Sequence, residues 1–271
     1  MRIKLTIRPF HNVIVPVNYQ YPLSSAIYTI LNTASPEYSD FLHNKGYIGT
    51  DGKLRKLYAF SFLKFYPPKK LKNKKFHLNK HDTATLIICS PMLKDFIQNF
   101  VVGLFTHQKI EINSQGHRAP FFVERVETIE QPEFKKEMKF RMLSPLVVST
   151  QIDTDKGLQT YYYRPFDENI SEAMRQSLFK KYKTIYYKSP DNAELKFEID
   201  KEYIKRKGGE KKVSKLITLS EGNKDETRIK GFLSPFIMKG SPELMKTAWD
   251  CGLGDKCSLG FGCIDIVRKN T

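Results

Sequence analysis

The amino-acid sequence predicts an α+β protein made of two tandem ferredoxin-like domains, each with the element order β-α-β-β-α-β. Two observations predict this class. Segments with alternating apolar residues and segments with helical apolar spacing follow one another in that order over residues 1–130, and the order restarts over residues 140–271. The charged segment 131–139, which contains Pro132, is interpreted as a linker. The second half thus repeats the architecture of the first without repeating its residues.

The first half begins with a strand and two helices. The strand is indicated by alternating apolar residues at Ile3, Leu5 and Ile7. The first helix is indicated by apolar residues at helical spacing, which are Leu23, Ala26, Ile27, Ile30 and Leu31. Ser24 is a candidate cap near its start. Ser35 and Pro36 predict a second, short helix that stops near Gly46, which places His43 at its C-terminal end.

The remainder of the first half contains strands and one strongly amphipathic helix. We expect strands over residues 57–65, 84–90, 109–112 and 121–127. The lysine-rich segment 69–80 is expected to be a loop that projects into solvent. Ser90 and Pro91 begin the helix. Its apolar stripe consists of Leu93, Phe96, Ile97, Phe100, Val101 and Leu104.

The second half follows the same plan. We expect strands over residues 140–150, 194–199, 213–219, 228–238 and 261–267. One helix begins near Asp167, and its apolar face consists of Ile170, Ala173, Met174, Leu178 and Tyr182. Ser241 and Pro242 begin a second helix that runs to Cys251.

The charge of the chain indicates a polyanionic partner. The 271 residues include 45 Lys and Arg against 29 Asp and Glu, a formal net charge of +16. An anionic membrane surface is the competing partner, but no apolar run reaches the roughly 18 residues that span a bilayer. Charged Arg2, Lys4 and Arg8 also interrupt any signal-peptide pattern. We therefore expect a cytoplasmic protein that binds nucleic acid and no membrane.

The cysteines and histidines do not have the sequence spacing that is typical of metal ligands. The cysteines are Cys89, Cys251, Cys257 and Cys263, and none forms a Cys-x-x-Cys pair. They are expected to be reduced and buried. His77 and His81 are four residues apart, but their lysine-rich and asparagine-rich segment lacks a helical apolar period. We expect no metal site.

A glycine-rich segment near the C-terminus is the most specific motif. Residues 252–262 contain Gly252, Gly254, Gly260 and Gly262, with Lys256 between the two glycine pairs. Glycine lets backbone N–H groups approach a phosphate closely, because no Cβ intervenes. A simple helix C-cap would explain Gly252 but not the other three glycines. We therefore expect Gly252, Gly254, Lys256, Gly260 and Gly262 to bind an RNA backbone.

Two common nucleotide-binding motifs are excluded by the position of this segment. A dinucleotide fingerprint starting at Gly252 would need glycine where Cys257 stands, and it would precede a helix rather than a strand. The phosphate-loop ending Gly-Lys-Ser/Thr is absent. We expect no cofactor.

The segment, with its Gly-Leu-Gly start and Gly-Phe-Gly end, resembles the C-terminal signature of the CRISPR-associated repeat-processing endoribonuclease family. Further similarity lies in the basic first strand, the Ser-Ala-Ile-Tyr sequence at Tyr28, the Phe-Leu-His sequence at His43, and Leu143 to Pro145. The resemblance implies two RRM-like ferredoxin domains, with the glycine-rich loop packed between them and taking part in RNA binding. It further implies a partner, CRISPR repeat RNA.

The resemblance also implies a reaction and its residues. Members of this family cut precursor CRISPR RNA without a metal, with the 2′-hydroxyl of the RNA as nucleophile. This chemistry uses a base, an acid and a cation beside the phosphate. His43 matches the family's histidine, Tyr28 matches a tyrosine that aids catalysis in some members, and Lys56 matches a lysine that stabilises phosphate charge. Lys53 and Arg55 are close enough in sequence to replace Lys56 in that role.

The sequence is also compatible with two functions other than that of an active nuclease. The same fold and loop would serve a protein that binds repeat RNA without cutting it, or a general RNA-binding protein. The lysine-rich stretches 69–75, 180–183 and 205–215 are candidate contacts for an RNA backbone in each case. CRISPR effector subunits are further candidate partners, and a monomer and a homodimer are both compatible with the sequence.

Overall fold

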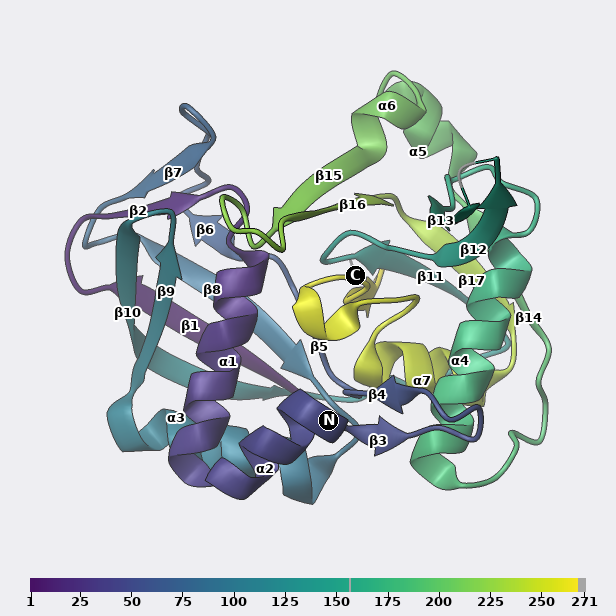
Figure 1. Cartoon of the computed structure of the whole chain (residues 1–271), viewed down its shortest axis with the longest axis horizontal. Coiled ribbons are helices and arrows are strands. Elements are labelled where there is room, and N and C mark those ends of the chain that lie inside the picture. Colours follow the sequence, from purple (N-terminus) through teal and green to yellow (C-terminus); the bar gives the residue numbers. More distant parts are fainter. Residues whose placement is uncertain (156, 268–271) are drawn as a thin grey trace.

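The computed structural model describes residues 1–155 and 157–267, which form two sheet-based halves that lie side by side (Figure 1). The first sheet contains β1 (Arg2–Pro9), β5 (Ala59–Phe60), β6 (Lys64–Tyr66), β8 (Thr83–Cys89), β9 (Lys109–Ser114) and β10 (His117–Ile129). Its strand order is β5-β8-β1-β10-β9, and β6 also pairs with β8. Helices α1 (Gln20–Ala34) and α3 (Asn99–His107) contribute their apolar residues to the core against this sheet.

The second sheet has the same topology. It contains β11 (Glu137–Met142), β14 (Leu195–Ile199), β17 (Phe236–Gly240) and β18 (Ile264–Ile266), in the order β14-β17-β11-β18. Helices α4 (Ile170–Tyr186) and α7 (Pro242–Cys251) pack on it. In each half the order is second, third, first and fourth core strand, with antiparallel neighbours. The predicted pair of ferredoxin-like folds is confirmed.

Shorter elements decorate the two sheets. In the first half these are β2 (Val13–Pro16), α2 (Pro36–Asp40), η1 (Phe41–Lys45), β3 (Tyr47–Ile48), β4 (Leu54–Arg55), β7 (Lys75–Leu78) and η2 (Leu93–Gln98). In the second half they are β12 (Ser149–Thr154), β13 (Gly157–Tyr162), α5 (Lys201–Arg206), α6 (Glu210–Val213), β15 (Ser214–Leu219), β16 (Thr227–Phe232) and η3 (Cys257–Leu259). The β15–β16 hairpin crosses from the second half toward β2 of the first (Figure 1).

The predicted helix starts are partly confirmed. Ser35 caps α2 by accepting a hydrogen bond from the Tyr38 N–H at 3.2 Å, and Ser241 caps α7 in the same way. Ser24 is not a cap, because α1 begins four residues earlier and Ser24 is buried inside it. Leu93 does not belong to the buried stripe and is 54% exposed. The reason is a π-helical first turn, in which the Ile97 N–H donates to the Met92 carbonyl.

Two predictions in the first half need correction. The strand expected over residues 57–65 is broken into β5 and β6, because Phe62 leaves the sheet and its N–H donates to the Leu143 carbonyl of the second half. The lysine-rich segment 69–80 is not simply a solvent loop, since β7 pairs with β2 and buries Leu78. At its start, Lys69 forms a salt bridge of 2.6 Å with Asp82.

Three strands predicted for the second half are shorter or interrupted. The strand expected over 140–150 becomes β11 and β12, because the N–H groups of Leu143 and Ser144 turn to the Cys263 carbonyl. The strand expected over 228–238 is divided into β16 and β17 at Ser234 and Pro235. The strand expected over 261–267 is reduced to β18, since the preceding glycine-rich loop has positive φ angles.

A buried arginine joins the two halves. Arg2, on β1, is fully buried, and its guanidinium donates to the Trp249 carbonyl at the end of α7 and to the Ile264 carbonyl of β18. Its Cζ atom also lies 4.0 Å from the centroid of the Trp249 ring. The first strand therefore contributes a cation to the junction rather than to an exposed basic face. The pairs Lys4–Glu127 and Arg8–Glu124 neutralise the rest of that face.

Candidate active site and RNA interface

His43 is presented by a local deformation of the helix that follows Ser35. Helix α2 continues into the π-helical turn η1, which ends at Gly46 with φ of 73°. His43 is exposed, and its Nδ1 atom lies 2.9 Å from the side-chain oxygen of Asn44. With Nδ1 donating to that oxygen, the neutral ring carries its lone pair on Nε2. The geometry suits proton transfer at Nε2.

Tyr28 and Lys56 lie against His43 although they come from different elements. The rings of Tyr28, on α1, and His43 meet edge to face with centroids 5.4 Å apart. The Lys56 ammonium, in the segment between β4 and β5, lies 5.1 Å from the Tyr28 ring centroid and donates to the His43 carbonyl at 3.0 Å. The Tyr28 hydroxyl is buried and has no hydrogen-bond partner among the described residues. All three predicted side chains thus form one cluster.

The two alternative cations are placed differently. Arg55 donates two hydrogen bonds of 2.8 Å to Asp51, and this pairing is the main cause that lowers the pKa of the Asp51 carboxyl. Lys53 lines the neighbouring cleft, and no contact joins it to His43 or Tyr28 in the described structure. Lys56 is therefore the cation of the three that touches both His43 and Tyr28.

A cleft of about 690 Å³ at the junction of the two halves is lined by Lys56 of this cluster, whereas His43 and Tyr28 do not line it. Its walls are the β3–β4 region, helix α4 and the glycine-rich loop. Six basic and three acidic side chains line it: Lys53, Arg55, Lys56, Lys180, Lys181, Lys256, Asp51, Glu172 and Asp255. The excess of positive charge suits an RNA backbone.

Two of the four glycines of residues 252–262, Gly252 and Gly260, let the two halves pack closely. All four have positive φ. A Cβ on Gly252 would lie 2.8 Å from Ala59, and one on Gly260 would lie 2.8 Å from the Phe60 ring. The N–H groups of Gly252, Gly260 and Gly262 already donate to protein carbonyls.

The part of the loop that faces the cleft is shorter than the sequence motif. Gly254 and Lys256 line the cleft, whereas Gly252, Gly260 and Gly262 do not. Of the five predicted RNA contacts, the structure therefore brings two to the cleft, and it places the other three where they set the shape of the loop.

Two side chains that the sequence did not single out as site residues hold this loop. The Lys181 ammonium donates to the carbonyls of Gly252 and Gly254 at 2.8 and 2.9 Å. Burial is the largest single effect and opposes its charge, but Cys257, Cys251 and Asp255 together more than offset it, so the pKa of Lys181 is raised above its usual value. Ser24 donates from α1 to the Ser258 carbonyl at 2.8 Å. In the sequence, Lys181 is marked only by its position in the lysine-rich stretch 180–183.

Replacement of Gly254 by alanine should destabilise the protein and weaken RNA binding. A Cβ at this position would lie 2.2 Å from the Val147 carbonyl oxygen. The matched control is Gly116→Ala, because Gly116 has a φ of 74°, close to the 75° of Gly254, but nothing within 4 Å. We expect about 1 kcal/mol of destabilisation in the control from the left-handed conformation alone. Urea unfolding should show at least twice that loss for Gly254→Ala, and equal losses would contradict this role.

The other aromatic, histidine and cysteine residues that could bind RNA or a metal do not belong to the cluster of Tyr28, His43 and Lys56. Tyr58 and Phe60 are buried core residues. His77 is on β7 and His81 is in the turn that follows, so they share no helix face. The four cysteines are free and buried. No group of three or more His, Cys, Asp or Glu side chains in residues 1–155 and 157–267 has metal-site geometry, and no helix in these ranges is long and apolar enough to span a membrane.

The fold and the site define a protein with two ferredoxin-like units, a basic cleft at their junction, and a cluster of Tyr28, His43 and Lys56 that meets the cleft through Lys56. Residues 14–127 match the family model for the N-terminal part of CRISPR-associated protein Cas6, and residues 129–266 match the model for its C-terminal part. The chain belongs to the Cas6 family of CRISPR-associated endoribonucleases.

Relatives match along the whole chain. CRISPR-associated endoribonuclease Cas6 1 of Methanocaldococcus jannaschii is 30% identical over 100% of this chain and 94% of its own length. A solved structure described as CRISPR-associated protein Cas6 is 28% identical, with a TM-score of 0.74 and 99% of each chain covered. A structure described as a RAMP protein binding different RNA substrates has a TM-score of 0.78 at 24% identity, over 99% of this chain and 100% of its own, a likeness of fold.

Proposed function

We propose that this protein cleaves precursor CRISPR RNA within its repeats, without a metal ion, to release guide RNAs. The observation that carries the proposal is the contact of His43 with Tyr28 and with Lys56, which also lines the basic cleft. Membership of the Cas6 family supports the substrate class. The reaction is attack of the 2′-hydroxyl on the adjacent phosphorus, which leaves a 2′,3′-cyclic phosphate and a 5′-hydroxyl.

The geometry of the cluster supports the following roles. Nε2 of His43 accepts the proton of the 2′-hydroxyl, since Nδ1 is engaged with Asn44. The Lys56 ammonium stabilises the charge that develops on the phosphate oxygens. Tyr28 packs edge to face on the His43 ring and holds its orientation. The leaving 5′-oxygen takes its proton from water.

Cleavage of repeat RNA should continue unchanged in excess chelator, because the proposed roles belong to side chains and to the RNA itself. A substrate with a 2′-deoxy sugar before the scissile phosphate should bind but remain intact, since it lacks the nucleophile. Gel analysis of end-labelled RNA measures both results. Chelator-sensitive cleavage, or cleavage of the deoxy substrate, would contradict the proposed chemistry.

A non-catalytic protein that holds repeat RNA is the second candidate function, because the cleft and loop would serve binding equally well. Tight, salt-sensitive binding with no product over hours would favour it.

We further propose that the protein acts in the cytoplasm as a monomer or homodimer, with CRISPR effector subunits as further partners. Sedimentation of the free protein and of its RNA complex tests the oligomeric state.

A further inference from the structure

Two polar side chains form a hydrogen-bonded chain that ends at His43. Asn44 follows His43 in the π-helical turn η1, and its side-chain oxygen lies 2.9 Å from Nδ1 of His43. The side-chain NH2 group of Asn44 donates to the carboxylate of Asp40, the last residue of α2, at 2.6 Å. The contacts therefore run from the carboxylate of Asp40 through the amide of Asn44 to the imidazole of His43.

The local helix brings Asp40 and Asn44 together. Helix α2 passes directly into η1, and two residues four apart lie on the same side of a helical segment. Both side chains are exposed, and Asp40 forms no salt bridge with any residue of 1–155 or 157–267. The hydrogen bond from Asn44 is therefore the contact that engages this carboxylate within the described chain.

The direction of each hydrogen bond in this chain follows from the carboxylate. An ionised carboxylate only accepts hydrogen bonds, so Asn44 must turn its NH2 group to Asp40 and its oxygen to His43. An amide oxygen also only accepts, so Nδ1 of His43 must carry a proton. In a neutral imidazole free in water the Nε2–H form is the more common, and Nε2 then has no lone pair with which to accept a proton. The chain therefore selects the form of the ring that can act as a base at Nε2.

The other neighbours of His43 hold the ring without selecting its tautomer. Tyr28 packs edge to face on the ring, with centroids 5.4 Å apart, and this packing does not depend on which nitrogen carries the proton. Lys56 donates to the backbone carbonyl of His43 and not to its ring. The choice between the two neutral forms therefore falls to Asp40 and Asn44.

We infer that Asp40 and Asn44 are positioning residues that keep the proton of the neutral His43 ring on Nδ1, so that Nε2 is free to accept the proton of the RNA 2′-hydroxyl. When Nε2 takes that proton, Nδ1 keeps its own and still donates to Asn44, and no proton passes to Asn44 or Asp40. After the cut, Nε2 returns its proton to water. The inference rests on the proposed function, because it explains how the base of that reaction is held in its active form.

The tautomer can be measured directly by nitrogen NMR of protein labelled with ¹⁵N-histidine, at a pH where the ring is neutral. The His43→Ala variant identifies the signals of His43 by their loss. The wild-type ring should carry its proton on Nδ1, and Asn44→Leu, which keeps the shape of the side chain but removes the acceptor, should move the proton to Nε2. A wild-type ring protonated on Nε2, or a tautomer that is the same in both proteins, would overturn the inference.

An exchange of the two groups tests the role in cleavage. Asp40→Asn should slow single-turnover cleavage about three- to tenfold, the range expected for one hydrogen bond, because the amide of Asn44 is then free to flip. Adding Asn44→Asp should restore the rate to within about twofold of wild type, with each protein measured at its own pH optimum. The new carboxylate accepts directly from Nδ1, and the new amide donates to it. Affinity for a 2′-deoxy substrate should not change, and a double variant as slow as Asp40→Asn would overturn the inference.

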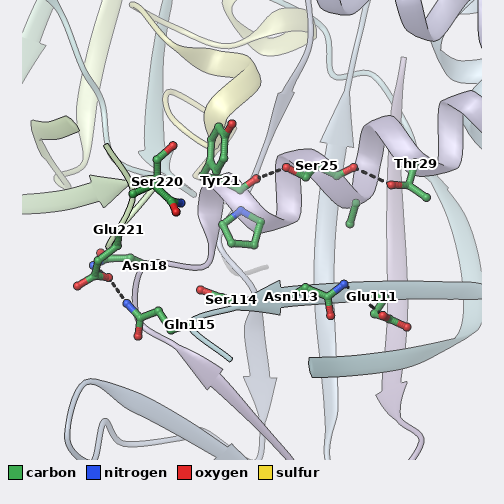
Figure 2. Close-up of a pocket in the computed structure, with 13 residues that line it drawn as sticks. Asn18, Tyr21, Ser25, Thr29, Glu111, Asn113, Ser114, Gln115, Ser220 and Glu221 are labelled. Atoms are coloured by element: carbon green, nitrogen blue, oxygen red, sulfur yellow. Dashed lines mark hydrogen bonds between the residues drawn. The ribbon is translucent and has the colours of Figure 1, made fainter. Parts of the chain in front are cut away.

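The matched control is Asn113→Leu. Asn113 is also exposed and donates to a neighbouring carboxylate, that of Glu111 on β9, at 3.2 Å (Figure 2). Its removal should change neither the tautomer of His43 nor the rate, and a loss equal to that of Asn44→Leu would overturn the inference. Cleavage that needs His43 but is unaffected by Asn44→Leu would remove only the positioning role. An Asn44-dependent Nδ1–H tautomer in a protein that never cuts RNA would support the tautomer assignment and contradict the proposed function.

Discussion

Replacement of His43 by alanine is expected to slow cleavage of repeat RNA by about 10²–10⁴-fold, the usual contribution of a general base. The affinity for uncleaved RNA should change little, because His43 is not among the residues that line the cleft and the lysines that line it remain. Single-turnover cleavage with the enzyme in excess, together with binding to a 2′-deoxy substrate, measures the two quantities separately. The His43→Ala variant should therefore still bind repeat RNA but cleave it far more slowly.

The matched control is His107→Ala. His107 is also an exposed histidine at the C-terminal end of a helix, in this case α3, but it contacts neither Tyr28 nor Lys56 in the described residues. The His107→Ala variant should cleave repeat RNA at the wild-type rate. Equal rates for both variants would remove the catalytic assignment of His43, and loss of RNA binding together with cleavage in His43→Ala would indicate a role in binding instead.

Replacement of Arg2 by methionine should lower the free energy of unfolding by about 4 kcal/mol, because charge-assisted hydrogen bonds contribute about 1.5–3 kcal/mol each and do not add fully. The change would leave the buried carbonyls of Trp249 and Ile264 without their donor. Urea unfolding followed by circular dichroism measures the loss.

Lys4→Met is the control for Arg2, since Lys4 is two residues away on the same strand and forms a surface pair with Glu127. Exposed pairs contribute about 0–1 kcal/mol, so this variant should remain close to wild type. A loss in Arg2→Met no greater than that of Lys4→Met would show that the buried guanidinium contributes little to the junction.

The element order could be predicted from the sequence because apolar periodicity survives in each core element. Strand ends could not, because they depend on contacts between the halves. Phe62 and Leu143 leave their sheets to hydrogen-bond with each other across the junction, and nothing in their local sequence indicates it. Likewise, Leu93 fits a helical stripe by its spacing, but the π turn rotates it to solvent.

The candidate catalytic cluster was predicted from resemblance and not from spacing. Tyr28, His43 and Lys56 share no periodicity, and only the folded chain brings them together. Their roles remain predictions. Lys181 could not be distinguished from other lysines of its run, because what sets it apart is contact with carbonyls more than 70 residues away in sequence.

The position of Arg2 constrains how the chain acquires its structure during synthesis. Its partner Trp249 lies 247 residues later in the sequence. A chain that leaves the ribosome from its N-terminus therefore carries this guanidinium without its final acceptors until Trp249 and Ile264 have been made. The first half can collapse around its own sheet, but the end of β1 that meets α7 and β18 stays hydrated until then. The junction can therefore close only after these residues have been made, and the wall of the basic cleft that the second half supplies reaches Lys56 only then.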